Sequence, residues 1–159
     1  MNNVILIAGV HGVSGRAAAE HWASLPDTRV YGLSRRSAPL PAAVEAITTD
    51  LLDRDDLQRK LEPISGITHI VFGAYIEKPT TTERSEANLA ISKNLLDVVE
   101  ESSPSLRHVA FYQGGKAYGA DLGPFKTPAR EDDPRLMPPN FYYDQEDFLR
   151  ERQQGKACA

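Results

Sequence analysis

The chain has 159 residues, a length typical of one domain, and 41% of them are hydrophobic, enough to bury a core. Its formal net charge of −4 excludes the strongly basic proteins that bind nucleic acid or anionic membranes without specificity. The single cysteine, Cys158, excludes an intrachain disulfide and a cysteine-rich metal site, so we expect no bound metal. The N-terminal apolar run is too short to span a bilayer and has no basic leader, so we expect a cytoplasmic protein.

The N-terminal segment combines a strand pattern with a glycine motif. Residues 3–8 form a short continuous apolar run, as in a buried parallel strand, and residues 16–23 are rich in helix formers. Between them, Gly9, Gly12 and Gly15 have the spacing Gly-x-x-Gly-x-x-Gly. The first glycine permits a tight turn, the second lets the backbone approach a pyrophosphate, and the third lets the helix pack against the strand. Because N–H groups at a helix N-terminus favour anionic oxygens, the motif predicts a dinucleotide site; a structural glycine-rich turn is the alternative.

The second predicted strand, residues 29–33, ends in Ser34, Arg35 and Arg36. An acidic residue at this point would bind the ribose 2′-hydroxyl of NAD, whereas arginines accommodate the 2′-phosphate of NADP. The sequence therefore predicts NADPH as the cofactor. The alternative is a loop in which both arginines are simply solvated.

The third predicted strand, residues 44–49, leads directly into a helix signal. Asp50 and Leu51 come at the carboxyl end of this strand, where Asp50 is well placed to meet an adenine amino group. Asp53 is a suitable N-cap residue for a short helix that continues through Leu61.

Three more elements follow in the middle of the chain. Residues 67–72 form a fourth apolar strand, and residues 73–75 after it are expected beside the ribose on the nicotinamide side. Apolar residues recur at helical spacing from residue 82 to residue 102, which predicts an amphipathic helix. Residues 106–112 form the fifth predicted strand.

Lys116 follows the fifth strand, and Tyr142 opens the last predicted helix, residues 140–154, after a long loop at residues 119–139. Reductases on a nucleotide-binding sheet commonly place a tyrosine four residues before a lysine on one helix, but the residue four after Tyr142 is Glu146. Lys116 is therefore the candidate partner, because an ammonium favours the phenolate and steadies negative charge developing on a substrate oxygen. The alternatives are an aromatic core run and a solvated loop lysine.

The order of these elements predicts an α/β fold with a Rossmann-type doubly wound parallel sheet, forming the nucleotide-binding half only, as one domain over residues 1–159. In such sheets ligands bind outside the carboxyl ends of the strands, where the strand order reverses. All the motifs above fall at that edge. Since an uncovered sheet edge invites pairing, we expect a homodimer, or a monomer of marginal stability.

Several segments resemble the progesterone 5β-reductase and iridoid synthase-like family of atypical short-chain dehydrogenases/reductases. The resemblance covers essentially the whole chain and is most specific in Gly114-Gly115-Lys116-Ala117-Tyr118, Leu122-Gly123-Pro124-Phe125 and Asn140-Phe141-Tyr142-Tyr143-Asp144-Gln145-Glu146-Asp147. It implies that Lys116 and Tyr142 are catalytic and that the arginine pair binds the 2′-phosphate of NADP. It also implies a set of cofactor neighbours: His11, Gly12, Val13, Ala74, Tyr112 and Gln113.

The resemblance implies reduction of the C=C bond of α,β-unsaturated carbonyl compounds (enones) by NADPH. In that reaction Tyr142, supported by Lys116, would hydrogen-bond the carbonyl oxygen as it becomes an enolate. Full family members continue beyond the tyrosine helix into a substrate-binding region, so we expect a C-terminally truncated or frameshifted member. Two functions stay open, an enone reductase and a non-catalytic NADP-binding or dinucleotide-sensing module. A ketone reductase or sugar-nucleotide epimerase is less well supported, because those usually keep Tyr-x-x-x-Lys on one helix.

Overall fold

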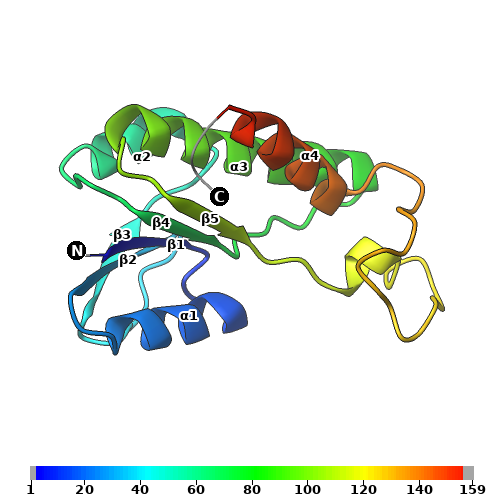
Figure 1. The fold of residues 1–159 in the computed structure, drawn as a ribbon, viewed down its shortest axis with the longest axis horizontal. Coiled ribbons are helices and arrows are strands. Elements are labelled where there is room, and N and C mark those ends of the chain that lie inside the picture. The colour runs from blue at the N-terminus through cyan, green and yellow to red at the C-terminus, as the bar shows by residue number, and fades with distance from the viewer. Residues whose placement is uncertain (1–2, 156–159) are drawn as a thin grey trace.

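A parallel sheet of five strands forms the middle layer of the molecule, whose computed structural model describes residues 3–155 (Figure 1). In chain order the strands are β1 (Asn3–Ala8), β2 (Thr28–Ser34), β3 (Val44–Thr48), β4 (His69–Phe72) and β5 (His108–Phe111). Their order across the sheet is β3-β2-β1-β4-β5, and each neighbouring pair is parallel. The chain thus runs outward from β1 in one direction and then crosses to β4 on the other side. This confirms the predicted doubly wound α/β sheet.

Helices cover both faces of the sheet (Figure 1). On one face lies α1 (Val13–Ala23), and on the other lie α2 (Arg54–Leu61), α3 (Thr81–Ser102) and α4 (Phe141–Gln153). A short 3₁₀ helix, η1 (Gly115–Tyr118), follows β5 and precedes the loop of residues 119–139, which extends away from the sheet. Among residues 3–155, no helix has the length and apolar character needed to cross a membrane.

Side-chain caps fix where three helices begin. Asp53 caps α2 as predicted, with its carboxylate accepting a backbone N–H in the first turn at 2.9 Å. Thr80 and Glu83 form a reciprocal capping box, so α3 begins one residue earlier than predicted. Asn140 accepts the N–H of Tyr142 at 3.1 Å and starts α4, which places Tyr142 in its first turn.

The sheet divides the hydrophobic core into two parts. Leu6 of β1 points toward α2 and α3, where Leu57 and Leu95 are fully buried. Ile5 points the opposite way, toward α1, whose Ala19 is small enough for close packing against the sheet. Because successive side chains alternate between the two faces, a strand buried on both sides must be apolar throughout. Each such leucine or isoleucine contributes about 1.5–3 kcal/mol when fully buried.

Most predicted boundaries differ from the structure by one residue, and the larger differences are in α1, β4 and β5. α1 begins at Val13 rather than at residue 16, because Gly12 already occupies the N-cap position. β4 begins two residues later than predicted, although Ile67 is fully buried. β5 is shorter than the predicted residues 106–112, because the N–H of Leu106 bonds back to the carbonyl of Ser103 in a turn.

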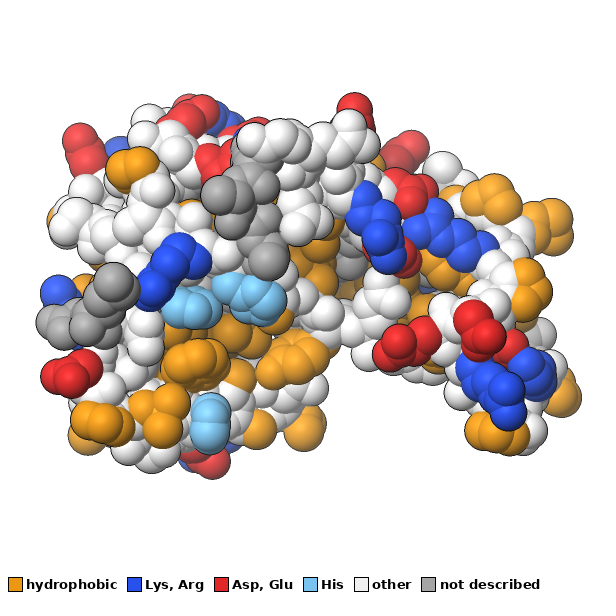
Figure 2. Space-filling model, in the orientation of Figure 1, with side chains coloured by type: hydrophobic (Ala, Val, Ile, Leu, Met, Phe, Trp, Pro, Cys, Tyr) orange, Lys and Arg blue, Asp and Glu red, His pale blue; other side chains and the backbone are white. Residues whose placement is uncertain are grey.

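The face of the sheet that carries α1 is less completely covered near β5. The ring of His69 lies 5.6 Å from that of Trp22 and 6.2 Å from that of His108, which is exposed. Figure 2 shows histidine side chains beside hydrophobic ones on the surface. Burial is the main cause that lowers the pKa of His69. Among residues 3–155, no strand pairs with the outer edge of β5.

Candidate functional site

The glycine turn between β1 and α1 is packed so closely that two of its glycines have no room for a Cβ. Gly9 has a φ of 80°, and a Cβ there would lie 2.7 Å from the carbonyl oxygen of Gly73. A Cβ on Gly15 would lie 2.3 Å from the carbonyl oxygen of Gly9. The N–H of Gly12 donates to that same carbonyl at 2.9 Å, and Gly12 is the N-cap of α1 without a side-chain cap. The first N–H groups of α1 are therefore left for an external acceptor.

A cleft of about 270 Å³ opens beside this turn, at the carboxyl ends of β1, β2, β3 and β4. The structure brings together here four segments that are far apart in the sequence: the glycine turn, the end of β2, the residues after β3 and the residues after β4. The predicted cofactor residues that line the cleft are Gly9, His11, Gly12, Ser34, Arg35, Arg36, Asp50, Leu51 and Ala74. Tyr75, expected near a ribose, also lines it.

Four lining residues were not singled out from the sequence. They are Leu33, Thr49, Ile76 and Ile91. The first two end or follow predicted strands, so their position at the carboxyl edge was a usable signal. Ile91 lies on α3, and its helical periodicity indicates only that it is buried.

The end of β2 presents two cations to the cleft. Within residues 3–155, neither Arg35 nor Arg36 forms an ion pair with a carboxylate. The hydroxyl of Ser34 accepts the N–H of Arg36 at 3.2 Å and so fixes the turn of the backbone there. Asp50 is held by the N–H of Leu52, which donates to its Oδ1 at 3.0 Å. Unpaired guanidinium groups and free helix N–H groups around one cleft fit a dinucleotide with phosphate groups.

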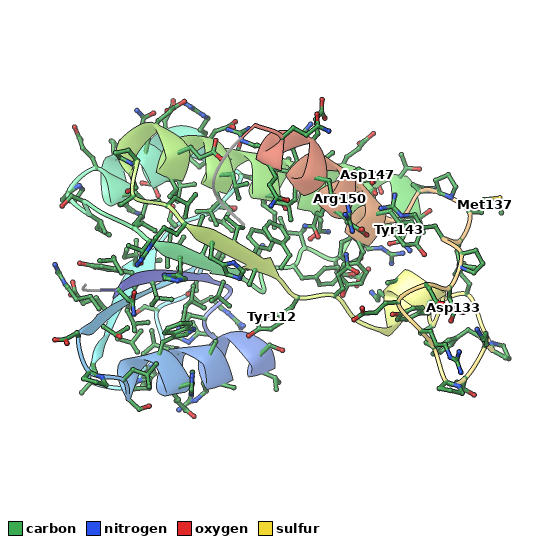
Figure 3. All side chains as sticks on the ribbon, viewed as in Figure 1. Tyr112, Asp133, Met137, Tyr143, Asp147 and Arg150 are labelled. Carbon is green, nitrogen blue, oxygen red and sulfur yellow. The ribbon has the colours of Figure 1, made fainter. Side chains whose placement is uncertain are left out.

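Four predicted cofactor residues do not line the cleft. Val13 is 93% exposed in the first turn of α1, and Gly15 is buried where α1 packs against the turn. Tyr112 follows β5, and a Cβ on Gly73 would lie 3.4 Å from its ring, which Figure 3 shows below the end of the strand. Gln113 donates to a backbone carbonyl in the first turn of α4 at 3.3 Å. Direct contact of these four with a cofactor stays a prediction.

A second part of the site lies where η1 meets the start of α4. A Cβ on Gly114 would lie 3.4 Å from the hydroxyl of Tyr142, so this hydroxyl lies against the glycine segment that precedes Lys116. Asn140 joins the two elements: its Nδ2 donates to the carbonyl of Lys116 at 3.0 Å, and its Oδ1 accepts the N–H of Tyr142. The structure therefore brings the segments of the two predicted catalytic residues together across the intervening loop.

The ammonium of Lys116 is hydrogen-bonded to two groups on the segment after β4. Its Nζ donates to the hydroxyl of Tyr75 at 2.7 Å and to the carboxylate of Glu77 at 3.3 Å. The bond with Tyr75 is the main cause that raises the pKa of Lys116. Glu77 was missed by the sequence reasoning. The available signal was its place beyond β4, since the carboxyl ends of adjacent parallel strands meet at one edge.

Burial dominates the protonation of Tyr142. It raises the pKa of the phenol, and the charge of Lys116 opposes it with a smaller effect. Lys116 acts in the predicted direction, since its charge favours the phenolate, but desolvation of the phenolate has the larger effect and the pKa of Tyr142 stays above its ordinary value. The protonated phenol can still donate a hydrogen bond to a substrate oxygen.

A network of charges continues from Glu77. Arg84 on α3 pairs with Glu77 at 3.2 Å and with Asp121 in the long loop at 2.9 Å. The hydrogen bond from Tyr75 is the main cause that lowers the pKa of Glu77 to about 2. In the described part of the chain, residues 3–155, no group of three His, Cys, Asp or Glu side chains could hold a metal ion; Cys158 lies outside it.

A family model and several curated proteins match most of the chain. The profile described as the NAD dependent epimerase/dehydratase family matches residues 5–153. An (S)-8-oxocitronellyl enol synthase from Nepeta racemosa is 36% identical over 167 residues, which cover 96% of this chain and 42% of that protein. A 3-oxo-Delta(4,5)-steroid 5-beta-reductase from Arabidopsis thaliana is 37% identical over 92% of this chain and 41% of its own length. These matches confirm the predicted resemblance, and the chain spans about two fifths of the length of these relatives.

Solved structures share the fold at lower identity. A short-chain dehydrogenase/reductase superfamily protein from Agrobacterium tumefaciens with bound NAD has a TM-score of 0.75 and 21% identity, over 98% of this chain and 47% of that chain. UDP-glucose 4-epimerase from Bifidobacterium longum, in complex with NAD+ and UDP, has a TM-score of 0.74 and 18% identity, over 95% of this chain and 49% of that chain. Both similarities concern the arrangement of the sheet and its helices.

Proposed function

We propose that this chain, which belongs to the NAD-dependent epimerase/dehydratase family, is the NADPH-binding part of a reductase that acts on the C=C bond of α,β-unsaturated carbonyl compounds. The observation that carries the proposal is the pair of unpaired guanidinium groups, Arg35 and Arg36, in a cleft beside a turn that has no room for a Cβ at Gly9 or Gly15. Lys116 and Tyr142 at the same edge of the sheet support the reductase part. The expectations of a cytoplasmic location and of no nucleic-acid or membrane partner belong to the same proposal.

The substrate class follows from chemistry that the relatives share. A 3-oxo-Δ4,5 steroid is a ketone conjugated to a C=C bond, and the name of the relative assigns it a 5β-reductase activity. An enol synthase makes a product of the kind formed when a conjugated carbonyl gains a hydride at its β-carbon. Both names fit a site that stabilises negative charge on a carbonyl oxygen.

Each group of residues has a separate task in the proposed reaction. The N–H groups of α1 and the glycine turn bind the pyrophosphate, and Arg35 and Arg36 bind the 2′-phosphate. NADPH supplies the hydride when it is bound. The Tyr142 hydroxyl donates a hydrogen bond to the substrate oxygen, and Lys116 stabilises the charge that develops there.

The first test is a pair of fluorescence titrations with NADPH and NADH. We expect tighter binding of NADPH, and Arg35→Ala with Arg36→Ala to weaken it by about 3 kcal/mol, on the order of a hundredfold, with little effect on NADH. Arg29→Ala with Arg130→Ala removes the same charge away from the cleft and should leave both affinities unchanged. Equal affinities for the two coenzymes in the unmutated chain would refute the choice of NADPH.

The second test is NADPH oxidation with and without a small enone such as cyclohexenone. Enone-dependent oxidation supports the reductase. NADPH binding without oxidation supports the second candidate, a non-catalytic NADP-binding module. That candidate is favoured by one observation, the engagement of the Lys116 ammonium by Tyr75 and Glu77 rather than by Tyr142.

A further inference from the structure

Tyr75 is shared by the cofactor cleft and the Lys116 segment. It follows β4 and lines the cleft, with 38% of its surface exposed. Its ring lies 5.2 Å from that of Phe141, the first residue of α4. Its hydroxyl accepts the hydrogen bond from Lys116, whose Nζ lies 4.8 Å from the centre of the same ring. One side chain therefore contacts the cleft, the lysine and the helix that carries Tyr142.

Glu77 provides the second contact with the ammonium. Its carboxylate accepts from Lys116 at 3.3 Å and also from the hydroxyl of Tyr75. Arg84 on α3 donates to the same carboxylate at 3.2 Å, and only 15% of the Arg84 side chain is exposed. Glu77 is thus tied to a helix, although 62% of its own side chain is exposed.

The lysine needs such partners because of its own chemistry and position. Its four-carbon stem is flexible, and its charge is strongly hydrated, so the backbone alone does not fix where the ammonium lies. Lys116 belongs to η1, a single turn of 3₁₀ helix. A group that must act at a definite distance from a substrate oxygen loses much of its effect when it is free to move.

We propose that Tyr75 is a positioning residue, which holds the ammonium of Lys116 at the edge of the cofactor cleft with Glu77 as the second anchor. The inference rests on the proposed function, since it gives Lys116 its task beside the substrate oxygen. The groups that face the ammonium are Tyr75 and Glu77 after β4 and Tyr142 on α4, and Arg84 on α3 pairs with Glu77. Asp121 of the long loop completes the network through Arg84.

The direct test measures the chemical reactivity of Lys116, with no need for turnover. Acetic anhydride labels the uncharged amine, and mass spectrometry gives the extent of labelling at each lysine, with exposed Lys93 as the internal reference. Tyr75→Phe keeps the ring and removes only the hydroxyl. We expect labelling of Lys116 to increase roughly three- to tenfold, because the hydrogen bond favours the charged amine. Tyr118→Phe is the matched control, since it removes a hydroxyl from the same 3₁₀ helix as Lys116.

A second pair of variants keeps the test independent of Tyr75. Glu77→Gln should also increase labelling of Lys116, because it removes the anion beside the ammonium, while Glu86→Gln on the exposed side of α3 should not. Unchanged labelling in both Tyr75→Phe and Glu77→Gln would overturn the proposal. An equal increase in Tyr118→Phe would overturn it too, because it would indicate a general loosening of η1.

Kinetics then separates this inference from the proposed function. Where the parent chain reduces an enone, Tyr75→Phe should lower kcat by up to about 100-fold with NADPH affinity nearly unchanged. Turnover that is unaffected while labelling rises would overturn the positioning role but leave the reductase intact. A parent chain without turnover would contradict the proposed function, and the labelling results would still decide whether Tyr75 holds Lys116.

Discussion

Gly15→Ala tests the close packing on which the cofactor cleft depends. The added Cβ would lie 2.3 Å from the carbonyl oxygen of Gly9 and 2.9 Å from its carbonyl carbon. Contacts under 3.0 Å are essentially never seen for a Cβ atom, so α1 or the turn must move. Both nearest atoms belong to the backbone, so no side chain can rotate away to make room.

The turn has little freedom to move in response. The Cα of Gly9 already lies so close to the residues after β4 that a Cβ there would be 2.7 Å from the carbonyl of Gly73. The helix must therefore shift away from β1, which loosens the buried cluster that Ala19 shares with Ile5 between α1 and the sheet. Overpacking of this kind costs about 1–3 kcal/mol. It also displaces the N–H groups that the proposed cofactor uses.

Urea unfolding and NADPH titration measure the two effects in one preparation. We expect Gly15→Ala to lower the unfolding midpoint and to weaken NADPH binding at least about tenfold, on the basis of the displaced N–H groups. Ser14→Ala is the matched control, because Ser14 is exposed on the same turn of α1. A Gly15→Ala protein with parental stability and parental NADPH affinity would refute the reasoning.

Three further predictions concern the site, the pH dependence of stability and the assembly. If the chain reduces enones, Tyr142→Phe should lower turnover by roughly 10²–10³-fold with NADPH affinity unchanged. Tyr143→Phe should be milder, since its hydroxyl bonds the carbonyl of Ala117 and the N–H of Leu136; equal losses in the two variants would contradict the assignment of Tyr142. The hydrogen bond from Lys60 is the main cause that lowers the pKa of Asp56 to about 2. The contribution of Asp56 to the stability of the fold is therefore complete above the ordinary pKa of 3.8 and is lost as the pH falls toward 2. In that pH range the urea midpoint should fall less steeply for Asp56→Asn than for the parent. Equal slopes for the two proteins would contradict this role of Asp56. Because the outer edge of β5 has no partner strand within residues 3–155, sedimentation should show a homodimer; a monodisperse monomer without dye-detected apolar surface would contradict this.

Local features of the sequence determined most of the fold. Continuous apolar runs predicted β1 and β2, because strands buried on both faces need apolar residues at every position. Asp53 was recognised as a cap from its own chemistry, since capping involves only neighbouring backbone groups. The glycine spacing likewise determined the turn, and the order of elements determined which edge of the sheet carries the cleft.

The tertiary structure alone decided how the proposed catalytic groups are arranged. The sequence paired Lys116 with Tyr142 and placed the segment after β4 at the same edge, but it did not determine that the ammonium bonds Tyr75 and Glu77, which lie about forty residues earlier. Those contacts depend on how β4 and β5 align and on where α4 packs, and both are set by long-range packing. The pKa of Tyr142 was decided in the same way, because burial depends on every element around the phenol, whereas the attraction of one lysine can be guessed from a motif.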